Sequence, residues 1–466
     1  MVIGQTIEHN MSQLLKTPVN RNKQMPLIAL CLGFFMVIID VTVVNVSLPN
    51  MTKNLGGDIS WLQWVVDSYT LTFACLLLSA GSFADRLGAK SAYLFGLFLF
   101  VLTSLACGLA THFLMLTIFR LMQGVAAAFV VPTSIALISS CYENKTERAR
   151  AIGIWASVGG IAAATGPVLG GVLTAWFGWR GVFFINIPVG MIGALLTIKY
   201  VINPISTDHK RSFDFPGQVT GIISIAALAF SLIEAGRLGW FSPVIMSGLC
   251  IFLLTFILFL MIEHRSESPM FPLSFFKSKN FSISMAVGTI LNIGFYGQFF
   301  LLPLYFQQIR GYTVLMTGLA ILPQALLSAV SSYFGGRVAS VYGPKMPMAI
   351  GLTIAAAGFF IMLMTGEHTP SYLLLILPLA AIGFGVTFTM PASTIAIINS
   401  VPSDRAGIAS GAFNASRQIG SLIGVAIFGT ILNTAKDFMM GMHIGLLIGG
   451  VIFVLACVAT LIGIEN

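Results

Sequence analysis

The sequence has little charge. Only 9% of its 466 residues are Asp, Glu, Lys or Arg, whereas 57% are hydrophobic. Soluble domains carry roughly a quarter charged residues, so this chain lacks the polar side chains that a water-facing surface needs. The deficit excludes an ordinary soluble enzyme and indicates a chain surrounded by lipid. The net charge of +8 therefore indicates basic loops beside a membrane rather than nucleic-acid binding.

Cysteine is also scarce, and nucleotide-binding motifs are missing. The six cysteines stand singly in or beside apolar runs, without metal-ligand spacing, so we expect neither disulfides nor a metal site. No G-x4-G-K-[ST] sequence occurs, which argues against ATP-driven pumping. The first 24 residues are polar, so 1–24 are predicted to form a cytoplasmic tail and not a cleaved signal peptide.

Long apolar runs fill the rest of the chain. A membrane-spanning helix needs about 20 mostly apolar residues. Fourteen runs of suitable length are present, at 25–48, 61–82, 91–110, 113–139, 151–175, 181–203, 216–234, 242–262, 281–306, 315–339, 346–365, 371–398, 406–435 and 441–464. None shows the alternation of a membrane β-strand. The sequence therefore predicts an all-α membrane protein with fourteen transmembrane helices.

Basic residues are distributed unevenly among the predicted loops. With the N-terminus placed inside, 17 of the 24 Lys and Arg residues fall on the inner side and five on the outer side. The remaining two, Arg120 and Arg417, lie within helices. Basic residues accumulate in cytoplasmic loops, so both termini are predicted to be cytoplasmic. The short loops and compact length favour a bacterial inner membrane.

The chain also contains an internal repeat. VVPTSIALISS (130–140) resembles MPASTIAIINS (390–400), and a short basic loop follows each segment. Chance similarity between apolar segments is the alternative explanation. The offset exceeds what six helices need, so we predict two six-helix bundles, 25–203 and 281–466, separated by two extra helices within a linker, 204–280. Parallel repeats of this kind are typical of transporters.

The loop after the second predicted helix carries a motif. It reads GSFADRLGAK (81–90) and resembles the loop motif of the major facilitator superfamily in five residues: Gly81, Asp85, Arg86, Gly88 and Lys90. Glycines permit a tight turn between helices. An acid at a helix N-terminus, or paired with a base, would latch the cytoplasmic side. The alternative is a generic basic loop, but the spacing favours the motif. The resemblance implies a major facilitator fold.

Two further helices extend the resemblance. The fourth contains FRLMQGVAAA (119–128), which is similar to a family motif in Arg120, Gln123 and Gly124. The fifth contains GIWASVGGIAAATGPVLGG (153–171), which resembles the antiporter motif at Gly153, Gly166, Pro167, Gly170 and Gly171. Residues 39–49 and 178–190 resemble segments of the fourteen-helix drug:proton antiporters. These matches imply an exporter; for the fifth helix, a plain small-residue packing face is the alternative.

Three charges lie deep in the predicted helices of the first half. By the helical rise, Asp40, Asp67 and Arg120 are each roughly 9–12 Å below the outer surface. Burial and a nearby guanidinium shift the pKa of a carboxyl group in opposite directions. We therefore predict a proton-coupling site with Asp40 as its principal proton carrier. The alternatives are a structural Asp40–Arg120 ion pair and an interfacial position for Asp67.

The remaining candidates concern the substrate. Gln123 and Arg417 are candidate cavity residues, although Arg417 is equally placed to snorkel to the inner surface. The predicted function is proton-coupled export of hydrophobic or cationic drugs by alternating access. We expect a monomer in the lipid bilayer that needs no cofactor, is driven by the proton gradient, and binds small lipophilic substrates and protons but no nucleic acid. The alternative is an exporter dedicated to one metabolite, such as a siderophore, an amino acid or a lipid-like compound.

Overall fold

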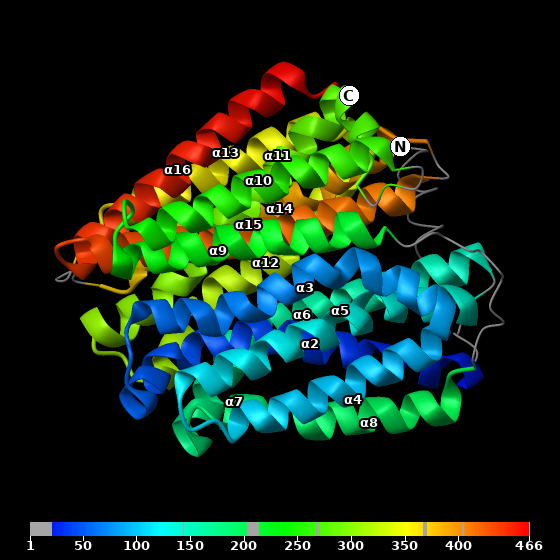
Figure 1. Cartoon of the computed structure of the whole chain (residues 1–466), viewed down its shortest axis with the longest axis horizontal. Coiled ribbons are helices and arrows are strands. Elements are labelled where there is room, and N and C mark those ends of the chain that lie inside the picture. Colours follow the sequence, from blue (N-terminus) through cyan, green and yellow to red (C-terminus); the bar gives the residue numbers. More distant parts are fainter. Residues whose placement is uncertain are drawn as a thin grey trace, which may run out of the picture.

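The computed structural model describes residues 21–142, 144–202, 214–266, 269, 271–366, 371–402 and 405–465. Within these ranges the chain consists of helices and short connections, without a β-strand. The helices lie side by side in one elongated bundle (Figure 1). Both ends of the described chain lie on the same side, which we call the terminal side. The predicted all-α architecture is therefore confirmed.

The helices before the predicted linker form what we call the first helix group. Their bounds are α2 (Arg21–Leu55), α3 (Ile59–Leu87), α4 (Ala89–Gly108), α5 (Phe113–Cys141), α6 (Lys145–Phe177), α7 (Gly181–Phe184) and α8 (Asn186–Tyr200). The sixth predicted helix is thus divided at Ile185 into α7 and α8. The first helix begins at Arg21 within the described chain, so the end of the predicted 1–24 tail is helical, and residues 1–20 lie outside the described part.

Two helices of the predicted linker, α9 (Phe215–Leu238) and α10 (Pro243–Arg265), precede the second helix group. A 3-10 turn, η1 (Leu273–Lys277), leads into that group. It comprises α11 (Lys279–Leu304), the π-helical turn η2 (Tyr305–Ile309), α12 (Val314–Tyr342), α13 (Lys345–Met362), α14 (Leu373–Asn399), α15 (Ala406–Thr434) and α16 (Phe438–Gly463). Among the described residues, 13 helices are long and apolar enough to cross a membrane. The further long helix is α3.

Polar side chains fix where several helices begin. The first backbone N–H groups of a helix have no partner within it, and Asp, Asn or Ser at the N-cap supplies one. Such caps start α3, α6, α9, α10 and α16, through Asp58, Asn144, Asp214, Ser242 and Asp437. These caps mark the starts of apolar runs that are long enough to span a bilayer.

Two extensive helix contacts join the two groups. Helix α3 packs against α15, and α6 packs against α12. At the second contact, Gly318 lies so close to α6 that an added Cβ would be 2.3 Å from the carbonyl oxygen of Pro167. Glycine therefore lets the two backbones approach, as is common between membrane helices. The linker helices α9 and α10 pack on each other, and α9 covers the line where α3 meets α15.

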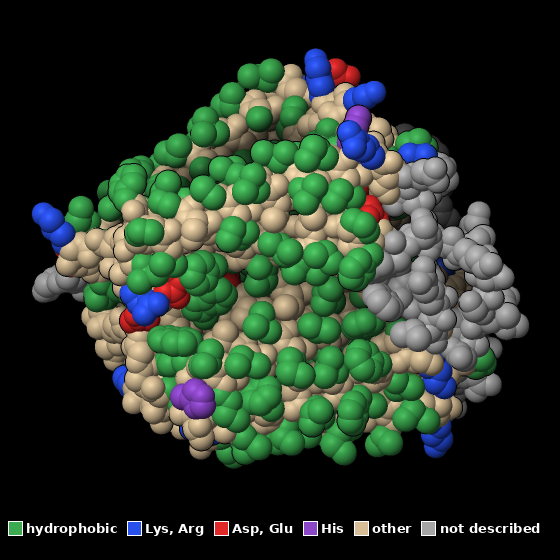
Figure 2. All heavy atoms as spheres, in the orientation of Figure 1, with side chains coloured by type: hydrophobic (Ala, Val, Ile, Leu, Met, Phe, Trp, Pro, Cys, Tyr) green, Lys and Arg blue, Asp and Glu red, His purple; other side chains and the backbone are tan. Residues whose placement is uncertain are grey.

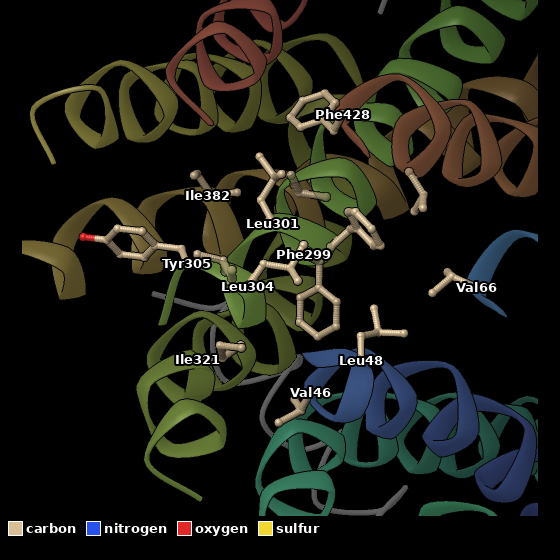
Figure 3. Close-up of a cluster of buried hydrophobic side chains, with 14 of the residues drawn as sticks. Val46, Leu48, Val66, Phe299, Leu301, Leu304, Tyr305, Ile321, Ile382 and Phe428 are labelled. Atoms are coloured by element: carbon tan, nitrogen blue, oxygen red, sulfur yellow. The ribbon is translucent and has the colours of Figure 1, made fainter. Parts of the chain in front are cut away.

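A buried apolar cluster connects the two groups on the side opposite the termini (Figure 3). Val46 and Leu48 from the end of α2 and Val66 from the start of α3 share it with Phe299 of α11 and Phe428 of α15. Two other clusters do not cross between the groups: one lies within the first group and one on the terminal side of the second. The shared apolar core therefore closes the molecule at the end away from the termini.

The outer surface suits lipid. Figure 2 shows hydrophobic side chains covering the middle of one face, with charged side chains gathered towards both ends of the helices. Large apolar residues such as Phe98, Leu195 and Leu254 are more than 60% exposed. A contiguous apolar surface of this extent belongs in a membrane rather than in water.

Candidate functional site

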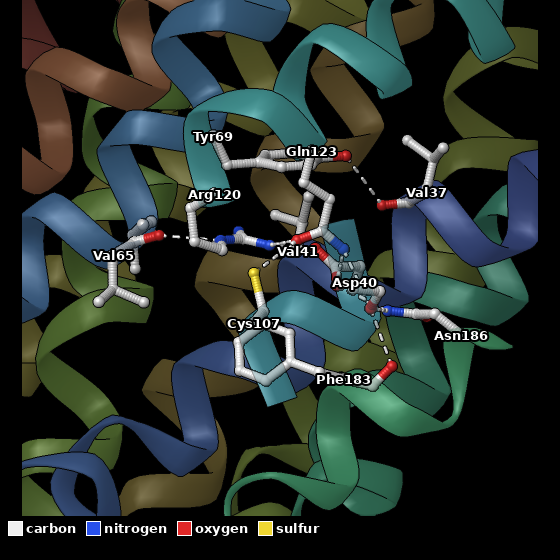
Figure 4. Close-up of polar contacts among 12 residues, drawn as sticks. Val37, Asp40, Val41, Val65, Tyr69, Cys107, Arg120, Gln123, Phe183 and Asn186 are labelled. Carbon is white, nitrogen blue, oxygen red and sulfur yellow. Dashed lines mark hydrogen bonds and ion pairs between the residues drawn. The ribbon is translucent and has the colours of Figure 1, made fainter. Parts of the chain in front are cut away.

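Asp40 and Arg120 form a buried ion pair in the first helix group. Asp40 lies on α2 and Arg120 on α5, and both side chains are at most 1% exposed. The Nη1 group of Arg120 donates to Oδ2 of Asp40 and, at 2.9 Å, to Oε1 of Gln123. Its Nε donates at 3.0 Å to the carbonyl oxygen of Val65 on α3. Asp40 and Arg120, which are predicted to lie at the same depth, are therefore in direct contact (Figure 4).

Amide side chains complete the coordination of Asp40. Its Oδ1 accepts from Nε2 of Gln123 at 3.0 Å and from Nδ2 of Asn186 on α8 at 2.8 Å. The hydroxyl of Ser104 on α4 lies within 3.3 Å of both amide groups. Sequence reasoning missed Ser104 and Asn186, although Asn186 stands in the segment 178–190 that resembles drug antiporters. Helices α2, α5 and α8 therefore meet at the carboxylate, and Ser104 of α4 contacts the two amides that bind it.

This network stabilises a buried ion pair. Buried charges are stable only when they are paired and hydrogen-bonded, and both conditions are met at Asp40 and Arg120. The guanidinium carbon also lies 4.4 Å from the ring centre of Tyr69, where a cation is attracted to the aromatic face. The ion pair and its hydrogen bonds thus connect α2, α3 and α5.

Asp67 has a different environment. Its side chain is fully buried, and neither carboxylate oxygen has a hydrogen-bond partner among the described residues. One turn earlier on α3, Nε2 of Gln63 donates to the carbonyl oxygens of Val425 at 3.2 Å and Ala426 at 2.7 Å on α15. One turn later, Leu71 packs in a cluster with Leu422 of α15. Residues four apart share one helix face, so Asp67 faces the contact between the two helix groups.

Two of the three predicted proton-coupling residues are therefore together, and the third is apart. Asp40 and Arg120 are bonded, whereas Asp67 makes no hydrogen bond to either of them in the part of the chain that is described. Burying a carboxylate anion without partners costs much free energy, and burying the neutral acid costs much less. Of Asp40 and Asp67, only Asp67 is buried without a hydrogen-bond partner among the described residues.

The predicted loop motif lies at the junction of α3 and α4. Gly88 adopts φ 84°, a left-handed conformation that glycine reaches without strain, and so ends α3. The Nζ group of Lys90 donates to the carbonyl oxygens of Ile198 at 3.1 Å and Val201 at 2.6 Å, at the end of α8. Residues 81–87, including Gly81, Asp85 and Arg86, belong to α3, but their side chains lie outside the described part.

The antiporter motif on α6 divides into a packed part and an open part. An added Cβ at Gly166 would be 1.8 Å from Oγ1 of Thr42, and one at Gly170 would be 2.8 Å from the carbonyl oxygen of Val43. Gly171 similarly meets the backbone of α12, and the carbonyl of Pro167 meets Gly318. Gly153, nearer the terminal side, has nothing within 4 Å. The motif therefore permits close packing only away from the termini.

The second candidate arginine, Arg417, lies on α15. It is half-buried, and its Nη1 donates to Oδ1 of Asn414 at 3.2 Å. The other predicted cavity residue, Gln123, is instead occupied in the Asp40 network. Arg417 thus has a much poorer set of partners than Arg120.

A separate apolar cavity of about 450 Å³ lies between the linker helices and the α3–α15 contact. Its walls come from α3, α9, α10, η1 and α15, and Phe256, Phe259, Phe271 and Phe276 supply much of them. A polar side chain in the wall, Gln218, donates to the carbonyl oxygen of Cys75 at 2.7 Å. The linker helices therefore add apolar space beside the contact between the groups.

The chain is similar to proteins named for drug resistance. It is 38% identical over 414 residues to the multidrug resistance protein Stp of Mycobacterium tuberculosis, covering 89% of this chain and 76% of that protein. It is 33% identical over 456 residues to the methylenomycin A resistance protein of Streptomyces coelicolor, covering 97% and 95%. It is 34% identical over 431 residues to the protein of the same name from Bacillus subtilis, covering 92% of each.

The fold is also that of a solved transporter. A bacterial homologue of the human lysosomal transporter Spinster, solved in an inward-facing, unoccupied conformation, superposes with a TM-score of 0.70. The match covers 96% of this chain and 98% of that one at 16% identity, which is evidence about the fold alone. The family model described as Major Facilitator Superfamily matches residues 30–425. The chain therefore belongs to the Major Facilitator Superfamily and is a membrane transporter rather than an enzyme.

Proposed function

We propose that this transporter exports lipophilic drugs, including cations, in exchange for protons. Several relatives are named for drug resistance or drug efflux, and these names support drugs as the substrate class. The excess of Lys and Arg in loops on the terminal side supports a cytoplasmic location for both termini. The bacterial relatives support a bacterial inner membrane. We further propose that the protein acts as a monomer without a cofactor.

The observation that carries the proton exchange is the unpartnered carboxyl group of Asp67. Helices α3 and α15 close over this group, which is fully buried and has no hydrogen-bond donor among the described residues. Closing them over a carboxylate anion would leave a buried charge uncompensated, whereas closing them over the neutral acid would not. The empty transporter therefore returns to the present conformation only after Asp67 has bound a proton.

Substrate then replaces the proton. A lipophilic cation beside α3 stabilises the Asp67 anion, since an opposite charge within about 4–6 Å favours the charged form of an acid. The proton leaves towards the terminal side, and the cation takes over the compensation of the negative charge. When α3 and α15 separate at the opposite end, water and protons reach Asp67 and the substrate is released there.

Asp40 has a positioning role in this scheme. The sequence predicts the principal proton-carrying role for it, whereas we propose that it serves as the ion-pair partner of Arg120. A proton on Asp40 would weaken the ion pair and would leave the buried guanidinium without its counter-charge. We therefore assign the proton to Asp67 and the fixed framework to Asp40, Arg120 and Gln123.

Two sequence motifs complete the proposal. The loop motif, with Gly81, Asp85, Arg86, Gly88 and Lys90, latches the cytoplasmic ends of the helices during transport. The antiporter motif provides the sliding surface on the other side. Its packed residues Gly166, Pro167, Gly170 and Gly171 let α6 move against α2 and α12 without side-chain obstruction.

Proton flux in vesicles tests the function. Inside-out vesicles from a host without other drug exporters are energised so that the lumen becomes acidic, and ethidium or tetraphenylphosphonium is added. We expect a pH-sensitive dye in the lumen to report alkalinisation with wild type and at least a tenfold smaller rate with Asp67→Asn. Asp58→Asn is the matched control, because it removes an exposed acid and keeps an N-cap.

Two results would contradict the proposal. Substrate accumulation without any lumenal pH change would contradict the proposal that the substrate is exchanged for protons. Silence across a broad panel of lipophilic drugs, with the protein present in the membrane, would favour an exporter dedicated to one metabolite instead.

A further inference from the structure

The second helix group has an unusual charge inventory. After residue 280 the acids are Glu367, Asp404, Asp437 and Glu465, and all four fall outside helices α11–α16. Arg417 stands 11 residues after the start of α15, which places it about 17 Å along that helix by a rise of about 1.5 Å per residue. This group therefore contains a cation at membrane depth and no acid in its helices to neutralise it.

The guanidinium of Arg417 uses few of its donors. Arginine offers five N–H donors in a fixed plane, and the hydrogen bond from Nη1 to Asn414 has a length of 3.2 Å. Its Nε is buried and has no hydrogen-bond partner among the described residues. The salt bridges within the described part join Arg120 to Asp40 and Arg237 to Glu234. Arg417 thus has unused donor capacity and lacks a counter-charge there.

Helix geometry shows which way Arg417 faces. Gly420 and Gly424 of α15 pack against the backbone of α11. A Cβ added at either glycine would lie within 3.0 Å of the backbone of Thr289 or Ile293, respectively. Successive residues turn by about 100°, so Arg417 lies about 20° from Gly424 around the helix. The same geometry places it on the edge of that face nearer α3.

The opposite face of α15 confirms this direction. Ala415, Ser416 and Ile419 line the apolar cavity beside the linker helices, and they lie roughly 100–200° away from Arg417 around the helix. Arg417 is therefore turned away from α9 and towards the space bounded by α3 and α11. That side of α15 is where the two helix groups meet.

The chemistry of the group defines what it binds. A charged residue within the membrane is costly and is retained when it serves a function. Guanidinium groups bind planar oxyanions through two parallel hydrogen bonds, and such bonds are about twice as strong as neutral ones. A purely cationic molecule, in contrast, offers no acceptor for these donors.

We propose that Arg417 binds an acidic group of the transported molecule, such as a carboxylate, so that lipophilic acids and zwitterions are preferred substrates. The inference rests on the proposed export function and refines its substrate class. A zwitterion would place its anionic group at Arg417 on the second helix group and its cationic group towards Asp67 on the first. A simple lipophilic cation would use the Asp67 side alone.

Equilibrium binding to the purified protein in detergent tests this inference without depending on proton exchange. The probes are nalidixic acid, a lipophilic carboxylate, and tetraphenylphosphonium, a lipophilic cation. We expect Arg417→Gln to weaken nalidixate binding at least tenfold, to leave tetraphenylphosphonium binding within twofold, and to leave the melting temperature near that of wild type. Arg417→Lys keeps the charge but loses the planar donor pair, so an intermediate affinity is expected.

Arg405→Gln is the matched control, because it removes one positive charge at the cap of the same helix. The inference is overturned if wild type does not bind nalidixate, or if Arg417→Gln leaves its affinity unchanged. Equal losses for both probes, or an equal effect of Arg405→Gln, also overturn it, because they indicate a structural or a general charge effect. Failure of drug-induced proton flux in vesicles, with these binding results intact, would instead contradict the proton exchange.

Discussion

Asp40 and Asp67 are two buried acids of the same helix group, and their surroundings are opposites. Asp40 receives hydrogen bonds from Arg120, Gln123 and Asn186, which come from α5 and α8. Asp67 has none among the described residues and faces the contact with the second helix group. Burial alone therefore does not identify a proton carrier. In the proposed scheme, the hydrogen-bond partners of a buried acid decide its role: Asp40, with several partners, holds Arg120, and Asp67, without them, carries the proton.

Breaking the Asp40 network should have the largest effect. Arg120→Leu leaves the Asp40 carboxylate buried without its counter-charge, and loss of one partner of a buried ion pair costs about 3–5 kcal/mol. We expect a strongly lowered melting temperature in detergent, or loss of the protein from the membrane. The measurement is thermal unfolding of the purified protein followed by tryptophan fluorescence.

The double variant Asp40→Asn, Arg120→Gln is the control for that experiment. It removes both charges together while it keeps side chains that hydrogen-bond, so much of the lost stability should return. An Arg120→Leu variant that melts with wild type would show that the network contributes little, and the contrast with Asp67 would lose its basis.

A second experiment separates the helix groups without changing either acid. In Gly318→Ala the new Cβ meets the Pro167 carbonyl oxygen at 2.3 Å, so α6 and α12 must move apart. Overpacking of this kind costs about 1–3 kcal/mol, and we expect a lower melting temperature. Gly153→Ala is the matched control on α6, where nothing lies within 4 Å. There the better helix propensity of alanine should stabilise by up to about 1 kcal/mol. The same sign for both variants would contradict the packing described for the motif.

The smallest effect is expected at the contact that covers Asp67. Gln63→Ala removes two hydrogen bonds from α3 to the backbone of α15, each worth about 1 kcal/mol. Because the cover over Asp67 is weakened, we expect a faster proton leak through energised vesicles in the absence of drug, by severalfold. A leak equal to that of wild type would mean that this contact does not control access to Asp67.

Much of the fold follows from sequence. The apolar run lengths and the repeat at 130–140 and 390–400 predict the helices, because a bilayer demands long continuous apolar segments. The division of the sixth helix at Ile185 is a local detail that run length does not encode. The depth of Asp40, Asp67 and Arg120 is also predictable, since depth depends only on the rise per residue.

The rotation of each helix could not be predicted in the same way. Arg120 bonds to the carbonyl of Val65, whereas Asp67, two residues later, is turned by about 200° towards α15. Three charges at one depth therefore do not form one cluster. Ser104 and Asn186 were missed for the same reason, because tertiary packing determines which faces of α4 and α8 point at Asp40.

Proton release on drug binding tests the central contrast most directly. Purified protein in weakly buffered detergent solution is mixed with tetraphenylphosphonium, and a pH indicator counts the protons released by wild type, Asp67→Asn and Asp40→Asn. We expect release by wild type and by the folded fraction of Asp40→Asn, and none by Asp67→Asn while it still binds the drug. Release by Asp67→Asn equal to wild type, with loss in Asp40→Asn, would contradict the assignment and return the proton to Asp40.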